Sequence, residues 1–197
     1  MAIIYYTDYK AASERHLETC LQIKEILEQQ FQPKTLLSAR EAKEQEQLLS
    51  NLYYLSGYVI ECIYNYAIFK NISFPSNVDV ADLKYNSGGL PRYPVLCNVA
   101  FRSNQHTPTG TFIIAGAIGH KLFGHMGFFQ THFIHTGASS IPLLNNQPLI
   151  RHCDTLFQAW DVYSRYKIDG SISLNCINTF DFFDLSVEVY EGIINHL

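Results

Sequence analysis

One long helical pattern limits the folds that are open to this chain. Over residues 38–70, apolar side chains recur at spacings of three and four, the period of an α-helix that packs against other elements. Ser38 followed by Glu41 is the Ser-x-x-Glu pattern of a capping box, which marks a helix start. From Leu48 onward, apolar residues occupy more than one stripe along the helix, so its apolar surface becomes wider. We therefore expect this segment to be the central helix of a bundle, buried on most of its circumference.

Three further segments have helical patterns. Residues 10–30 predict a first helix, with Ser13 as its N-cap and Pro33 after its end. Residues 149–166 and 174–196 predict the last two helices. On the last helix, the expected apolar side consists of Ile177, Phe180, Val187, Tyr190 and Ile194, with Asp181 and Glu188 opposite.

The middle of the chain has a different character. Prolines and glycines break any long element in 71–110, which predicts a long irregular connection. Residues 111–136 predict one helix, or two short ones broken near Gly124, and a second loop-like insertion covers 136–148. The expected fold is all-α. It is a single domain over residues 1–197, an antiparallel bundle of about five helices with a long insertion between the second and third.

Composition excludes some classes of protein. The net charge is -4 and no run of Lys and Arg occurs, so a surface that tracks long nucleic acids is not indicated, although a local basic pocket is left open. The five cysteines include no CxxC pair, as in cytosolic proteins with reduced thiols. There is no signal-peptide layout and no apolar run of about 18 residues, the length that a membrane span needs. We expect a cytoplasmic protein without a membrane partner.

The segment SNLYYLSGYVIECIYNYAIFK, residues 50–70, resembles the signature helix of the HEPN superfamily, the "higher eukaryotes and prokaryotes nucleotide-binding" helical domains. In the branch that it resembles, this helix has a tyrosine pair, a small-Gly-Tyr step and a glutamate. The matching residues here are Tyr53, Tyr54, Ser56, Gly57, Tyr58 and Glu61. Later motifs of that branch are matched, in the same order, by Gly119-His120-Lys121-Leu122 and by Trp160 with Arg165-Tyr166. The resemblance leaves out 71–110 and 136–148.

The resemblance implies a homodimeric module that binds a partner protein, a nucleotide or RNA. Its implied context is a toxin–antitoxin, nucleotidyltransferase-associated or phage-defence system, with a nucleotidyltransferase or an antitoxin as the partner. Many HEPN proteins are ribonucleases, with an arginine, four to six residues, and then a histidine. None of the arginines here has a histidine at that spacing, so we expect binding without catalysis and no cofactor. The alternative is a ribonuclease whose catalytic arginine and histidine have a non-standard spacing, and Arg102 and His106 are the candidates for that pair.

The signature helix itself contains a polar stripe. Tyr54, Tyr58, Glu61 and Asn65 are spaced four, three and four and so share one face. Gly57 costs about 1 kcal/mol of helix stability against alanine, so its presence predicts that another helix or a ligand approaches closely.

Glu61 needs a partner if it is buried, and Arg165 is the partner that we expect. Two interpretations are open. One is a structural ion pair between helices, and the other is a polar pocket for a nucleotide or RNA. The predicted ligand-binding residues are Tyr54, Tyr58, Glu61, Asn65, His120 and Arg165.

Four histidines, His120, His125, His132 and His135, fall within sixteen residues. Three imidazoles can hold zinc with an open position, so His125, His132 and His135 are the candidates for a metal site and for a metal-dependent enzyme, the second alternative. The cluster includes no HExxH spacing, no cysteine and no carboxylate. Structural histidines, or histidines that line a polar groove, are therefore the favoured interpretation.

Overall fold

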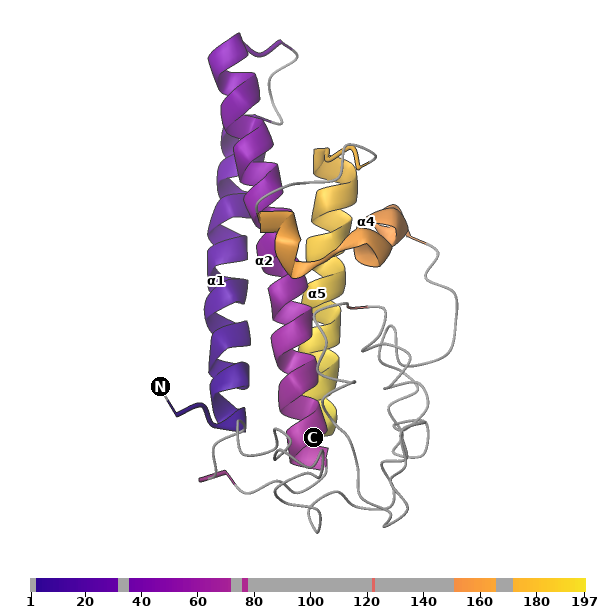
Figure 1. Cartoon of the computed structure of the whole chain (residues 1–197). Helices are drawn as coiled ribbons and strands as arrows, with labels where there is room; N and C mark the ends of the chain where they lie inside the picture. Colours follow the sequence, from indigo (N-terminus) through magenta and orange to yellow (C-terminus); the bar gives the residue numbers. More distant parts are fainter. Residues whose placement is uncertain (1–2, 32–35, 72–75, 78–121, 123–150, 166–171) are drawn as a thin grey trace.

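The computed structural model describes residues 3–31, 36–71, 76–77, 122, 151–165 and 172–197. This part of the chain contains the helices α1 (Tyr6–Gln30), α2 (Ala39–Asn71), α4 (Asp154–Ala159) and α5 (Cys176–His196), the 3-10 helix η6 (Val162–Arg165), and no strand (Figure 1). The all-α prediction is confirmed to that extent. The predicted helix at 111–136 and both predicted insertions lie outside the described residues, apart from Ser76, Asn77 and the buried helical residue Leu122, so the count of five helices stays a prediction.

Helix α2 is the centre of the fold. It packs against both α1 and α5, and every residue from 59 to 67 is buried, which confirms the expected central helix (Figure 1). The predicted capping box is present at its start. The Glu41 N–H donates to Ser38 Oγ over 3.3 Å, and the Ser38 N–H donates to Glu41 Oε2 over 2.9 Å. These bonds satisfy backbone donors that the first turn would leave unpaired.

Helices α2 and α5 run in the same direction. Near their first turns, Gln45 Nε2 donates to Cys176 Sγ over 3.9 Å, and further along both helices the rings of Tyr53 and Phe182 lie 5.4 Å apart. The antiparallel bundle was predicted from the short turn between the first two helices, and it does not extend to this pair. More than a hundred residues separate α2 from α5, so no short loop fixes their relative direction.

Helix α1 runs opposite to α5 and to α2. Lys24 pairs with Asp184 over 2.8 Å. Further along α5, the Tyr190 hydroxyl donates over 2.9 Å to Glu14, which lies nearer the start of α1. The ammonium of Lys24 also lies over the ring of Phe183, 5.2 Å from its centroid. These contacts fix the register of α1 against α5 with charge as well as with apolar packing.

The predicted start of α1 is wrong. The helix begins at Tyr6, where Asp8 Oδ2 accepts the Tyr5 N–H over 2.8 Å. Ser13 lies two turns inside and is fully buried, and its hydroxyl donates to the Val59 carbonyl over 2.9 Å. The polar residue that looked like an N-cap therefore forms a cross-helix hydrogen bond.

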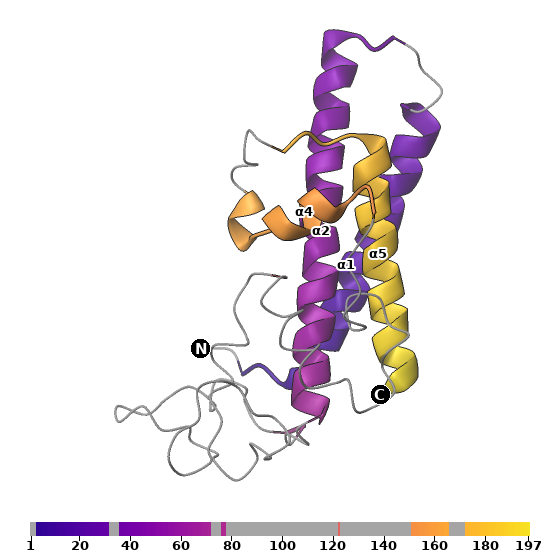
Figure 2. The same ribbon diagram turned by 90° about the vertical axis from the view of Figure 1, so that its right-hand side faces the viewer.

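The predicted single helix at 149–166 is also wrong. Helix α4 ends at Ala159, and Trp160 has an extended backbone with φ -64° and ψ 131° before η6 begins. Helix α4 packs on α5, whereas η6 packs on α2, so the segment crosses both helices (Figures 1 and 2). A continuous helix could not have brought Trp160 to α2 in this way.

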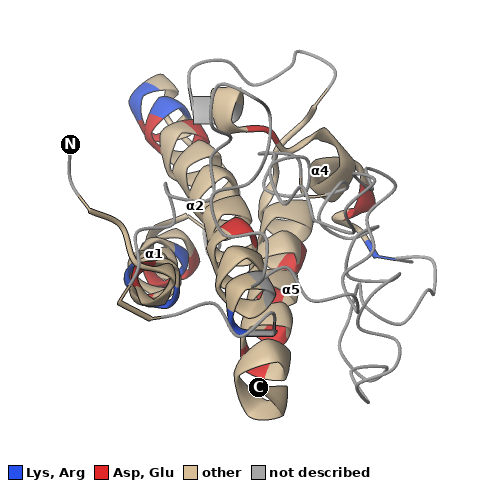
Figure 3. Cartoon of the chain, turned by 60° about the horizontal axis from the view of Figure 1, so that its bottom comes forward, with Lys and Arg blue, Asp and Glu red and all other residues tan. Residues whose placement is uncertain are grey.

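The buried side of α5 differs from the predicted one. Ile177 is 69% exposed, and Phe180, Val187, Tyr190 and Ile194 are only partly buried. The buried apolar side chains are those of Phe182, Phe183, Leu185, Val189 and Ile193, and the small polar residues Thr179 and Ser186 are buried with them. Helix α5 contains acidic residues but no Lys or Arg (Figure 3), and the predicted polar residues Asp181 and Glu188 are among the acidic ones. Within the described residues, no helix combines the length and apolar character that a membrane crossing requires.

Candidate ligand-binding site

The close approach predicted at Gly57 is made by Trp160. A Cβ at position 57 would overlap the indole atoms Nε1, Cε2 and Cδ1 of Trp160. The indole is 2% exposed, and its N–H donates to the Tyr54 carbonyl over 3.1 Å. Glycine is thus required in the middle of α2 because the tryptophan packs directly on the helix backbone.

Four rings meet around this contact and form what we call the aromatic cluster: His16, Tyr54, Tyr58 and Trp160. Tyr58 is central, with its ring 5.3 Å from Trp160, 4.8 Å from Tyr54 and 5.5 Å from His16. The contacts to Trp160 and Tyr54 are edge-to-face, at 88° and 74°, the geometry that aromatic quadrupoles favour. His16, Tyr54 and Tyr58 are partly exposed, so a ligand can reach the cluster.

Tyr58 and His16 of the cluster are uncharged at neutral pH. Burial and a hydrogen bond with Tyr54 raise the pKa of the Tyr58 phenol. Burial, and then the positive charge of Arg15, hold the pKa of His16 below its ordinary value. The exposed Arg15 is also close enough to lower the pKa of Cys62 against the larger effect of burial. The site therefore combines neutral rings with one nearby cation, Arg15, and with the Glu61 carboxylate, which helps to raise the pKa values of Tyr58 and Cys62.

Glu61 and Asn65 continue the predicted stripe into the interior. Their side chains are 5% and 2% exposed, one and two turns beyond Tyr58. Among the described residues, Asn65 Oδ1 has no hydrogen-bond donor, which is unfavourable for a buried acceptor. The stripe thus changes from partly buried rings at one end to buried polar groups at the other. Because the side chain of Arg165 lies outside the described part, its pairing with Glu61 stays a prediction.

His16 was not predicted as a site residue, and Trp160 was noted only as part of the resemblance. A signal for His16 existed in the sequence, since it is three residues after Ser13 and four before Cys20, which both face α2. Trp160 is the only tryptophan and Gly57 the only glycine of the long helix. A packing contact between Trp160, the largest side chain, and Gly57, the smallest residue, could have been predicted from the sequence on this basis.

Several predicted residues lie outside the described part of the chain. These are the displaced ribonuclease pair and the histidine-rich segment, namely Arg102, His106, His120, His125, His132 and His135. Their suggested roles stay predictions. Within the ranges that the structure describes, no three His, Cys, Asp or Glu side chains are grouped as metal ligands would be.

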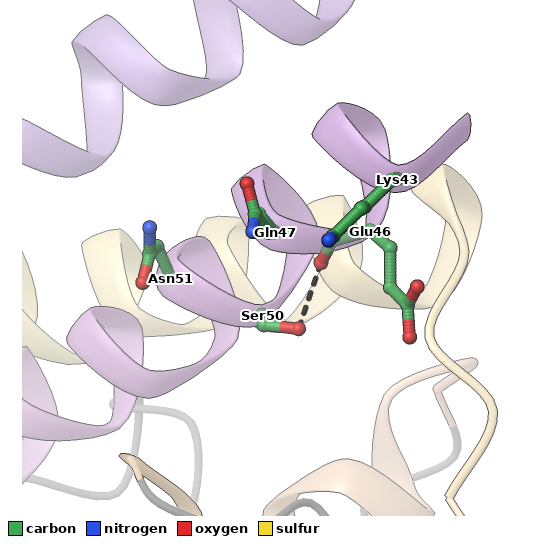
Figure 4. Close-up of a pocket in the computed structure, with 5 residues that line it drawn as sticks. All are labelled: Lys43, Glu46, Gln47, Ser50 and Asn51. Atoms are coloured by element: carbon green, nitrogen blue, oxygen red, sulfur yellow. Dashed lines mark hydrogen bonds between the residues drawn. The ribbon is translucent and has the colours of Figure 1, made fainter. Parts of the chain in front are cut away.

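A second surface feature is an open hollow along the first half of α2. The described residues that line it are Lys43, Glu46, Gln47, Ser50 and Asn51 (Figure 4). They follow one another on the surface of a single helix, and the Ser50 hydroxyl donates back to the Glu46 carbonyl over 2.7 Å. Because these side chains do not converge on one point from different elements, the hollow is a weaker candidate than the aromatic cluster.

Comparisons with protein-family models, with curated proteins and with solved structures give no match for this chain. An assignment of function therefore has to come from the residues of the chain itself.

Proposed function

We propose that this protein is a HEPN-like, non-catalytic helical module that binds a nucleotide, free or within a short single-stranded RNA, at the aromatic cluster. The observation that carries the proposal is the arrangement around Tyr58. Its partly buried ring contacts the rings of His16, Trp160 and Tyr54, and the cation Arg15 is near. Aromatic side chains stack on bases with about 1–3 kcal/mol per base, and a guanidinium is suited to phosphate.

Charge favours a small ligand over a long nucleic acid. The net charge is -4, and the acidic side chains of α5 would repel a phosphate backbone laid along that helix (Figure 3). A single base with its phosphate would need only the cluster and the nearby arginine.

The proposal includes binding without catalysis. The arginine–histidine spacing of the HEPN ribonucleases is absent from the sequence. His16 directly follows Arg15 and packs against Tyr58, so these two residues do not reproduce that spacing. We further propose a cytoplasmic homodimer that acts with a nucleotidyltransferase or an antitoxin.

A binding experiment on the full chain tests the proposal. The probes are AMP, ATP and a six-nucleotide single-stranded RNA, and binding is followed by calorimetry. Tyr58→Leu should weaken binding about tenfold or more, because it removes the stacking surface. Tyr163→Leu is the matched control, since Tyr163 is exposed on η6 and makes no ring contact in the cluster.

Two results would contradict the proposal. One is the absence of saturable binding for all three probes. The other is equal affinity in the wild type and Tyr58→Leu. Cleavage of the RNA probe during the titration would contradict the non-catalytic part alone.

A further inference from the structure

The segment 151–163, which we call the strap, is hydrogen-bonded to α5 chiefly through Arg151. Arg151 donates to both carboxylate oxygens of Glu188, over 2.9 and 3.0 Å, and from Nε to Asp181 Oδ1 over 3.0 Å. The other oxygen of Asp181 accepts the Cys153 N–H over 3.0 Å. The Arg151 guanidinium thus joins the two carboxylates Asp181 and Glu188. Asp181 also accepts a hydrogen bond from Cys153, the residue before α4.

The same segment is attached to α2 at its other end. The Tyr53 hydroxyl donates to the Leu156 carbonyl over 3.0 Å, and the Trp160 N–H donates to the Tyr54 carbonyl. Trp160 in turn contacts Gly57 and the ring of Tyr58. The position of the Tyr58 ring therefore depends on where the strap places Trp160.

The attachment to α5 has the geometry of a strong ion pair. A fork of two parallel N–H donors on a carboxylate is the arrangement in which arginine pairs are strongest and most specific. The Arg151 side chain is 24% exposed, so solvent screens it only in part. Burial alone would raise the pKa of Asp181, yet Arg151 and the Cys153 N–H hold it below its ordinary value. The favourable contacts of Asp181 therefore outweigh its desolvation.

We propose that Arg151 is a positioning residue for the aromatic cluster. It makes none of the ring contacts of the cluster, but its ion pairs to Asp181 and Glu188 fix the strap so that Trp160 reaches Gly57 and Tyr58. The effect on ligand affinity rests on the proposed function, whereas the placement of Trp160 does not.

The test uses the fluorescence of Trp160, the only tryptophan in the chain. In the ligand-free protein, Arg151→Met should shift the emission to longer wavelength and increase quenching by acrylamide, with the helical circular dichroism unchanged. Glu188→Gln, which keeps the shape of the side chain, should give a smaller shift in the same direction. Arg40→Met is the matched control, because Arg40 is exposed in the first turn of α2.

Affinity for the AMP probe is the second measurement. Arg151→Met should weaken it by roughly two- to thirtyfold, the range typical of residues that act at a distance. Arg151→Lys should restore part of the loss, since lysine keeps the charge but lacks the planar fork of donors.

The outcomes separate the two proposals. Emission and quenching that are identical in the wild type and Arg151→Met, or an equal shift in Arg40→Met, would overturn the positioning role. If Arg151→Met loses its helical signal, Glu188→Gln decides by the same measurement. A wild type that does not bind AMP counts against the proposed function, and the fluorescence of the variants still decides the role of Arg151.

Discussion

The indole of Trp160 fills the space that any side chain at Gly57 would need. A glycine in the middle of a helix costs about 1 kcal/mol against alanine. The burial of an entire indole and the hydrogen bond from its N–H to the Tyr54 carbonyl offset that cost. This pair joins the strap to the central helix at the aromatic cluster.

Gly57→Ala should expel Trp160 from this position. Overpacking of this kind costs about 1–3 kcal/mol, and the gain in helix propensity returns about 1 kcal/mol, so a net loss of up to about 2 kcal/mol is expected. Urea unfolding gives the change in free energy, and a red-shifted Trp160 emission shows its origin. Gly192→Ala, a helical control in α5, should leave the emission unchanged. A stabilised Gly57→Ala protein with unchanged emission would contradict the overlap.

Ser13→Ala should destabilise the contact between α1 and α2. The variant loses the buried hydrogen bond to the Val59 carbonyl, which contributes about 0.5–1.5 kcal/mol. Ser50→Ala is the control, because the hydroxyl of Ser50 donates only to the preceding turn of its own helix. Equal urea midpoints for the two variants would show that the Ser13 bond adds nothing to stability.

Acid should weaken the fold through His16. Its pKa in the folded protein lies below the ordinary value of 6.5, chiefly because of burial. As the pH falls below about 6.5, the unfolded state therefore takes up a proton that the folded state does not, and stability decreases until the lowered folded pKa is passed. His16→Gln should show a smaller loss of urea resistance between pH 7.5 and 5.5. The exposed His152, changed to Gln, is the control and should keep the full loss.

The purified protein should be a homodimer. Light scattering after gel filtration at micromolar concentration should give twice the chain mass of 22.5 kDa. The exposed apolar side chains of Leu21 and Ile26 on α1 lie outside the buried stripe Ser13, Cys20 and Leu27 and are available for such an association. A mass equal to one chain at this concentration would exclude the dimer.

The helix limits could be predicted where the signal is local. The start of α2 was found within one residue because Ser38 and Glu41 form a capping box through their own side chains. The start of α1 was missed because Ser13 has the side chain of an N-cap but uses it on Val59 of another helix. The break at Trp160 was missed for the same kind of reason, since it depends on a contact with Gly57 more than a hundred residues away.

The candidate site could be predicted only in part. Helical spacing alone predicts the shared face of Tyr54, Tyr58, Glu61 and Asn65. The close approach at Gly57 follows from the helix stability that a glycine costs, about 1 kcal/mol against alanine. The role of Arg151 could not be predicted, because its partners Asp181 and Glu188 are 30 and 37 residues away and the crossing of the strap is a property of the tertiary fold.

The parallel course of α2 and α5 also bears on how the chain reaches its fold. Helices α1 and α2 are neighbours in sequence and pair closely, so this hairpin can form early and at little loop entropy. Helix α5 has to find α2 across more than a hundred residues, as the contact of Tyr53 with Phe182 requires. We therefore expect pulse-labelled hydrogen exchange to show protection in 6–71 before 176–196. Equal rates of protection in both segments would mean that the hairpin is not an independent early step, and that the core closes only when the last helix arrives.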